Sequence, residues 1–102
     1  LGVYASMADK LQFDLVSPES LVLSAQVDSV SVPGVEGDFG VLPNHSPVMA
    51  MIRPGVLVVE NDGVVSEYHL DGGFVDVTPE GVTVLAETIL TAEQAAEADS
   101  TS

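Results

Sequence analysis

The sequence predicts an all-β domain of the sandwich or barrel type, on three observations. Short valine-rich segments are separated by proline or glycine clusters about every 8 to 12 residues, a spacing typical of such folds. Apolar and polar residues alternate within several of these segments, so each presents one face to a core. The chain has 102 residues, of which 46% are hydrophobic and 18% charged, a composition that suits one folded core and not a disordered chain.

The first half of the chain contains the clearest alternation. In residues 11–15 two leucines and a phenylalanine alternate with glutamine and aspartate, which predicts a strand with one buried face. Within residues 21–32 the apolar positions shift parity between Val27 and Val30, which indicates a bulge or a break between two strands. Val30 and Val32 are expected to point inward.

The second half contains two turn signals. Asn-Asp-Gly at 61–63 predicts a tight hairpin because these residues accept the positive φ that such a turn requires. Pro-Glu-Gly at 79–81 predicts another hairpin, preceded by a strand with Val75 and Val77 inward. Residues 56–59 are continuously apolar, so both faces of that strand are expected to be covered, one by the second sheet and the other by something else, such as a partner.

Three regions are expected along the chain. Residues 1–6 are interpreted as an expression scar or a disordered segment, and residues 7–90 as the β-sandwich domain. Residues 91–102 are predicted to form one short helix and a frayed tail, because Thr91 and Gln94 have the spacing of a capping box and alanines follow.

The charge balance excludes several classes of partner. Lys10 and Arg53 are the only lysine or arginine residues against 16 acidic ones, which gives a net charge of −14. No basic patch can be assembled from two cations, so nucleic-acid binding is excluded and anionic lipid surfaces are disfavoured. No apolar run approaches the roughly 20 residues of a spanning helix, so no direct membrane insertion is expected. The absence of cysteine excludes disulfides and thiolate zinc sites.

The residues capable of chemistry form no recognisable catalytic or metal motif, and no catalytic residue, metal or cofactor is predicted. His69 is expected to face solvent from a strand. His45 lies in a loop between Pro43 and Pro47, which restrict the backbone on both sides. It is interpreted as a loop histidine bonded to nearby backbone or as an interaction residue, with a general base as a further alternative.

The middle of the chain resembles a known family. Residues 36–47 read Glu-Gly-Asp-Phe-Gly-Val-Leu-Pro-Asn-His-Ser-Pro, which resembles the signature of the epsilon subunit of bacterial rotary ATP synthase, the counterpart of the mitochondrial delta subunit. Further similar segments follow in the same order as in that family, at residues 13–19, 52–57, 72–75 and 82–88.

The resemblance implies a flattened β-sandwich of about ten strands, followed in full-length members by two antiparallel helices, of which this sequence shows one short helix and no full hairpin. It also implies a non-catalytic central-stalk subunit of a proton-translocating ATP synthase. Such a subunit links the gamma subunit to the membrane c-ring and couples rotation to ATP synthesis, at the cytoplasmic face of the bacterial inner membrane. Nucleotide binding is not expected without the C-terminal helices, and no cofactor is implied.

The implied contact surface can be assigned position by position. The residues expected to meet gamma and the polar loops of the c-ring are Ser17, Asp38, Phe39, Leu42, Pro43, Asn44 and His45. Acidic residues near Asp38 are expected to pair with basic ring loops and to favour orientation and association rate more than affinity.

Two other functions remain as alternatives. A free-standing β-sandwich that binds a small ligand or carbohydrate would require a cleft with aromatic walls, although the chain has no tryptophan, two tyrosines and three phenylalanines. A small hydrolase would require a serine or carboxylate oxygen within hydrogen-bond reach of the His45 ring in a pocket.

Overall fold

The computed structural model describes residues 10–91, which form an all-β domain. The alternation of the sequence accounts for the strands, since each places apolar side chains on one face. The eight strands are β1 (Leu11–Val16), β2 (Leu21–Val27), β3 (Ser29–Val32), β4 (Phe39–Val41), β5 (Val48–Asn61), β6 (Val64–Thr78), β7 (Gly81–Leu85) and β8 (Ile89–Thr91).

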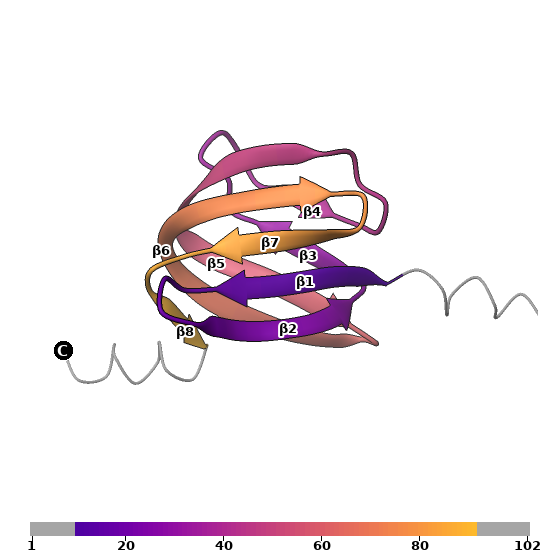
Figure 1. Ribbon diagram of the computed structural model, residues 1–102, viewed down its shortest axis with the longest axis horizontal. Helices are drawn as coiled ribbons and strands as arrows, with labels where there is room; N and C mark the ends of the chain where they lie inside the picture. The colour runs from indigo at the N-terminus through magenta and orange to yellow at the C-terminus, as the bar shows by residue number, and fades with distance from the viewer. Residues whose placement is uncertain (1–9, 92–102) are drawn as a thin grey trace, which may run out of the picture.

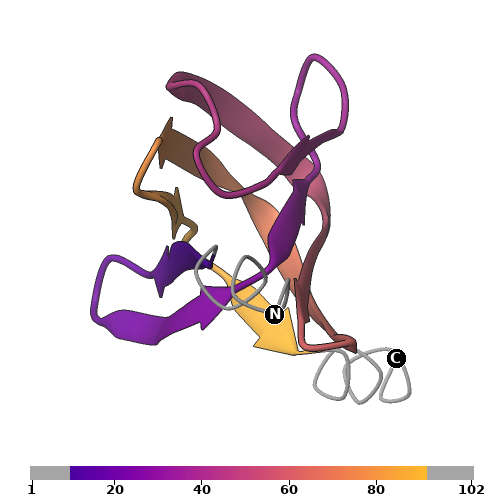
Figure 2. The same ribbon diagram turned by 90° about the vertical axis from the view of Figure 1, so that its right-hand side faces the viewer.

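The strands form one continuous sheet that folds into two layers. The order is β2-β1-β7-β6-β5-β3-β4, with β8 paired to β6 (Figure 1). Only the β1–β7 pair is parallel among these neighbours. Layer one contains β2, β1, β7, the second half of β6 and the first half of β5. Layer two contains β4, β3, the second half of β5, the first half of β6 and β8, as the side view shows (Figure 2).

Two long strands therefore belong to both layers. β5 and β6 pair with each other along almost their entire length, from Val48 opposite Val77 to Asn61 opposite Val64. Their bend coincides with Pro54-Gly55 in β5 and Gly72-Gly73 in β6. Gly73 has φ of 152°, and a side chain there would meet the Leu85 carbonyl oxygen at 2.3 Å. The sandwich class is confirmed. The structure has eight strands where about ten were expected, because β5 and β6 each contribute to both layers.

The core lies between the two layers. The alternation predicted for residues 11–15, for Val30 and Val32, and for Val75 and Val77 is confirmed, because all of these inward side chains are buried. Val82, Val84, Leu57, Val59 and Leu70 complete the same apolar cluster from β7, β5 and β6. Within residues 10–91 no buried side chain is polar or charged.

The turns follow the local sequence. Asp62 and Gly63 have φ of 54° and 81°, and they connect β5 to β6 as the predicted hairpin. The turn at 79–81 connects β6 to β7, with Thr78 opposite Gly81. The parity shift after Val27 corresponds to a break between β2 and β3 at Asp28.

Residues 56–59 were expected to be covered on both faces, yet within the described residues Val56 is exposed and Val58 half-buried, while Leu57 and Val59 are buried. Those outward side chains lie on the outer face of layer two, which no described element covers.

The predicted C-terminal helix lies almost entirely outside the described residues, as do residues 1–6. Its first residue, Thr91, belongs to β8. Across residues 10–91 no helix is long and apolar enough to cross a membrane.

Candidate functional site

Most of the predicted site residues lie in one segment between β3 and β5, residues 33–47, which we call the docking loop. Its first part is attached to β5 by main-chain hydrogen bonds. Val35 N–H donates to Met51 O and Arg53 N–H donates to Pro33 O, both at 2.9 Å. Gly37 N–H donates to Gly34 O at 3.1 Å and closes a turn. The loop is therefore held as an extension of layer one.

An ion pair joins the middle of the loop to β5. Arg53 donates from Nη2 to Oδ1 of Asp38, and the two side chains remain 46% and 61% exposed. Phe39, the next residue, is half-buried and packs against the core. Asp38 and Phe39 are adjacent in sequence, but one faces solvent and the other anchors the loop.

The second part of the loop is exposed and conformationally restricted. Leu42 projects into solvent, Pro43 is half-buried, and Asn44 has φ of 65°. The His45 Nδ1–H donates to the Ser46 carbonyl oxygen at 2.7 Å. A main-chain carbonyl is neither a nucleophile nor an acid, so this geometry matches the interpretation of His45 as a loop histidine bonded to backbone. His69 lies half-buried on β6, opposite Val56 and Leu90.

Ser17 is not part of this loop. It lies in the turn between β1 and β2, where its backbone N–H donates to Ser20 O at 2.9 Å. β7 and β6 separate β1 from β5 in the sheet. At about 4.8 Å per strand, Ser17 lies on the order of 14 Å along the sheet from the strand that holds the loop.

A row of apolar residues on the outer face of layer one connects these two places, and the sequence alone did not predict it. Val16 is opposite Leu85, Leu85 is opposite Phe74, and Phe74 is opposite Met51. Residues opposite one another in neighbouring strands share a face. We call these four residues the apolar row: Val16, Leu85, Phe74 and Met51. Leu85 and Met51 are 45% and 60% exposed.

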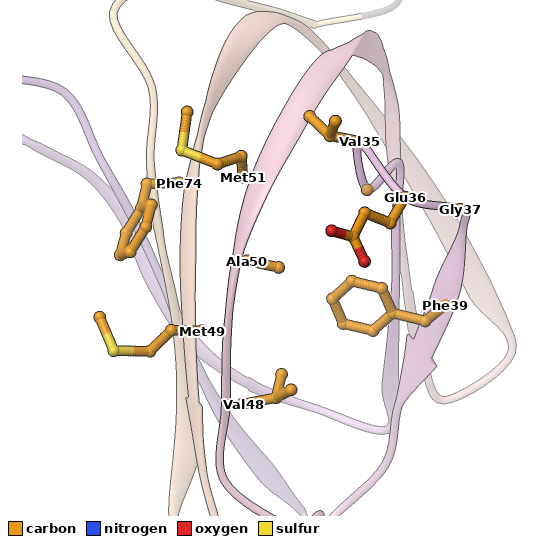
Figure 3. A pocket seen from close by; sticks show the side chains of 10 residues that line it. Val35, Glu36, Gly37, Phe39, Val48, Met49, Ala50, Met51 and Phe74 are labelled. Carbon is orange, nitrogen blue, oxygen red and sulfur yellow. The ribbon is translucent and has the colours of Figure 1, made fainter.

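The apolar row continues to the edge of the docking loop. Met51, Phe74 and Met49 lie on one side of β5, whereas Val48 and Ala50 point toward Phe39 on the other (Figure 3). The loop and this edge enclose a pocket of about 430 Å³, in which Glu36 is the one charged side chain. A pocket lined in this way offers few polar groups to orient a small ligand.

Comparison with known proteins identifies the family. The sequence profile of the family described as ATP synthase, Delta/Epsilon chain, beta-sandwich domain matches residues 10–92. The chain belongs to this family. The ATP synthase epsilon chain of Maricaulis maris is 58% identical over 81 residues, which are 79% of this chain and 61% of that protein. The epsilon chain of Parvibaculum lavamentivorans is 56% identical over 82 residues, 79% of this chain and 62% of that protein.

A solved structure gives the same assignment. A chain in the cryo-EM structure of the Euglena gracilis mitochondrial ATP synthase, described as OSCP/F1/c-ring in rotational state 1, matches with a TM-score of 0.79 and 25% identity. The match covers 83% of this chain and 55% of that chain. The chain therefore spans a little over half the length of that structure and about three-fifths of the two epsilon chains.

The predicted site residues lie at two places on the domain. Asp38, Phe39, Leu42, Pro43, Asn44 and His45 lie in the docking loop, which includes β4, and Ser17 follows Val16 at the other end of the apolar row. Within residues 10–91, no group of three or more histidine, cysteine, aspartate or glutamate side chains is placed to hold a metal ion. The site has the character of a contact surface, with apolar side chains outward and a loop restricted by prolines.

Proposed function

We propose that this delta/epsilon β-sandwich domain is a non-catalytic part of the central stalk of a proton-translocating ATP synthase. It docks on the gamma subunit and on the polar loops of the c-ring, and it takes part in coupling rotation to ATP synthesis. Family membership supports the assignment to this assembly. The single observation that carries the docking role is the apolar row, which runs across layer one and ends at the docking loop.

The apolar row is suited to the contact with gamma. Exposed large apolar side chains that are contiguous mark interaction sites more often than scattered ones do. Three strand spacings of about 4.8 Å give the row a length on the order of 14 Å, which matches an elongated apolar surface on a partner. Leu85 and Met51 are the members that a partner would bury most.

The second part of the docking loop is suited to the polar ring loops. Leu42 and Asn44 are exposed, and Pro43 and Pro47 restrict the backbone around His45. A restricted loop loses less conformational entropy on binding than a flexible one. Because β5 and β6 belong to both layers, a force applied at the loop passes directly into continuous strands of the sandwich.

Attachment to the membrane follows indirectly from this proposal. The domain would be held at the cytoplasmic face of a bacterial inner membrane by its protein partners. The alternative of a small-ligand or carbohydrate module is less favoured, because the pocket beside the docking loop has a single charged side chain and only two aromatic residues, Phe39 and Phe74.

Co-elution of the chain with the gamma subunit from the same source tests the proposal. Met51→Ser removes an apolar side chain from the row, and Val65→Ser removes one of similar exposure, 59%, from the outer face of layer two. We expect wild type and Val65→Ser to co-elute with gamma and Met51→Ser to do so weakly. Failure of the wild type to co-elute would contradict the docking role, and equal loss in both variants would contradict the assignment of the apolar row.

A further inference from the structure

Arg53 contacts the docking loop at both ends of its first part. Its backbone N–H donates to Pro33 O at 2.9 Å, where the loop leaves β3, and its guanidinium binds the Asp38 carboxylate, where β4 is about to begin. Arg53 of β5 therefore contacts both ends of the segment 33–38. The turn inside that span, with Gly37 N–H donating to Gly34 O, is enclosed between the two contacts.

The path of the Arg53 side chain is determined by its surroundings. A Cβ atom at Gly55 would lie 3.0 Å from Arg53 Nη1 and 3.2 Å from Pro33 Cβ. The guanidinium therefore lies over the backbone of Gly55 and beside the ring of Pro33. A planar guanidinium suits this position, because it can lie flat on the backbone while its edge donates to a carboxylate.

The two cations of the sequence are both used in contacts within the chain. Lys10 binds Asp28 and Asp62, and Arg53 binds Asp38. The chain has 16 acidic residues and two lysine or arginine residues. Asp38, in the docking loop, is paired with one of these two cations, Arg53. Its negative charge is compensated locally before any partner arrives.

We propose that Arg53 is a positioning residue for the docking loop: it contacts both Pro33 and Asp38 and holds Asp38 in an internal ion pair, so that the loop meets its partner preformed and with the Asp38 charge compensated. The docking half of this inference rests on the proposed function. The carboxylate remains accessible, because Asp38 is 61% exposed and the pair is made through Oδ1. The chemistry that fits the paired Asp38 carboxylate is a hydrogen-bond donor such as a main-chain or amide N–H.

Amide hydrogen exchange on the free 102-residue chain tests the positioning role. The amides of Val35 and Gly37, both hydrogen-bonded in the loop, are the probes. We expect Arg53→Gln to accelerate their exchange by about fivefold or more. The exchange rate in Arg53→Lys should lie between those of Arg53→Gln and wild type, because lysine keeps the charge and loses the planar group. Unchanged exchange in Arg53→Gln would overturn the positioning role.

Lys10→Gln is the matched control for this experiment. It removes the other cation together with its ion pairs to Asp28 and Asp62. These pairs lie at the β5–β6 turn, which at about 3.3 Å per residue is on the order of 25 Å along β5 from Arg53. We expect Val35 and Gly37 to exchange at the wild-type rate in Lys10→Gln. Equal acceleration in both variants would overturn the proposal, because the effect would then follow from net charge.

Binding to a gamma–c-ring assembly tests the docking half. The dissociation constants of wild type, Arg53→Gln, Asp38→Asn and Lys10→Gln are measured from about 50 to about 300 mM salt. We expect Arg53→Gln and Asp38→Asn, which both break the ion pair, to bind about fivefold more weakly than wild type across this range, and Lys10→Gln to bind like wild type.

The outcomes separate the two proposals. If the wild type does not bind, the proposed function fails, and the exchange experiment alone still decides whether Arg53 positions the loop. If the wild type binds and Arg53→Gln binds equally well, the docking half of the inference fails. Wild-type binding by Asp38→Asn would also overturn it, since the ion pair would then not be needed to hold the loop for its partner.

Discussion

Lys10 and Asp28 form an ion pair with 2.7 Å between Nζ and Oδ1, and the other oxygen of the same carboxylate accepts the backbone N–H of Asp62, also at 2.7 Å. The Lys10 ammonium further donates to Asn61 Oδ1 at 2.6 Å and to Asp62 Oδ1 at 3.0 Å. These contacts join the start of β1, the β2–β3 junction and the β5–β6 turn. Because β1 lies in layer one and the turn ends layer two, the cluster connects the two layers.

The stability of the domain is expected to depend on this cluster in a pH-dependent way. The hydrogen bond from Lys10, and after it the Asp62 N–H, lower the pKa of Asp28 below its ordinary range, so the folded state favours the charged carboxylate. The stabilisation is therefore present above the ordinary carboxyl pKa of about 4 and is lost as the pH falls through the lower folded-state value. The hydrogen bonds of Asp28 and Asp62 raise the pKa of Lys10, whose contribution is lost only at strongly alkaline pH.

Asp28→Asn tests this dependence. We expect its melting temperature to lie below that of wild type at neutral pH, and the difference to shrink as the pH falls below about 4. Asp76→Asn, which removes an exposed carboxylate from the outer face of layer one, controls for the change in net charge. A difference between wild type and Asp28→Asn that stays constant down to pH of about 2 would contradict the role of the ionised carboxylate.

Val84→Asp is expected to unfold the domain. Val84 is fully buried between Leu15 and Val75, and no described side chain there could pair with a carboxylate, because the core is entirely apolar. An unpaired charge costs several kcal/mol to bury, which is comparable to the whole stability of a small domain. Circular dichroism melting checks this, with Leu85→Asp, on the exposed face of the same strand and opposite Val16 and Phe74, as control. Cooperative unfolding of Val84→Asp near the wild-type temperature would refute the burial assigned to this face.

Gly73→Ala is expected to destabilise the domain by about 2 to 4 kcal/mol. The positive φ of Gly73 is unfavourable for a side chain, and the added Cβ would meet the Leu85 carbonyl oxygen. Gly40→Ala, where an added Cβ has no neighbour within 4 Å, is expected to change stability by less than about 0.5 kcal/mol. Urea denaturation of the two variants measures the difference, and equal stability would show that the bend of β6 does not depend on glycine.

His45→Ala is expected to leave folding nearly unchanged and to weaken assembly with gamma and the ring. Among the described residues its ring bonds only to the neighbouring Ser46 carbonyl, so the expected loss of stability is below about 0.5 kcal/mol. His69→Ala, on the outer face of layer two, should assemble like wild type. A large fall in melting temperature with normal assembly would contradict the role of His45 as a contact residue.

The inward faces and the turns could be predicted from local sequence. A strand places successive side chains on opposite faces, so the alternation of residues 11–15 was sufficient to identify the buried side of β1. The hairpin at Asp62-Gly63 was equally local, because positive φ is a property of those residues in a short turn. The continuous apolar stretch at 56–59 misled the same reasoning, since nothing local distinguishes a valine facing the core from one facing outward.

The sequence by itself determined the all-β class, the buried face of each strongly alternating strand, the main turns and the family, because these depend on residues close together in the chain. Only the tertiary structure decided which strands are neighbours, and hence that Val16, Leu85 and Met51 lie in one row. It also decided that Asp38 is paired with Arg53 within the chain. The register of distant strands and the partner of a charge depend on how the whole sheet packs, which no local pattern encodes.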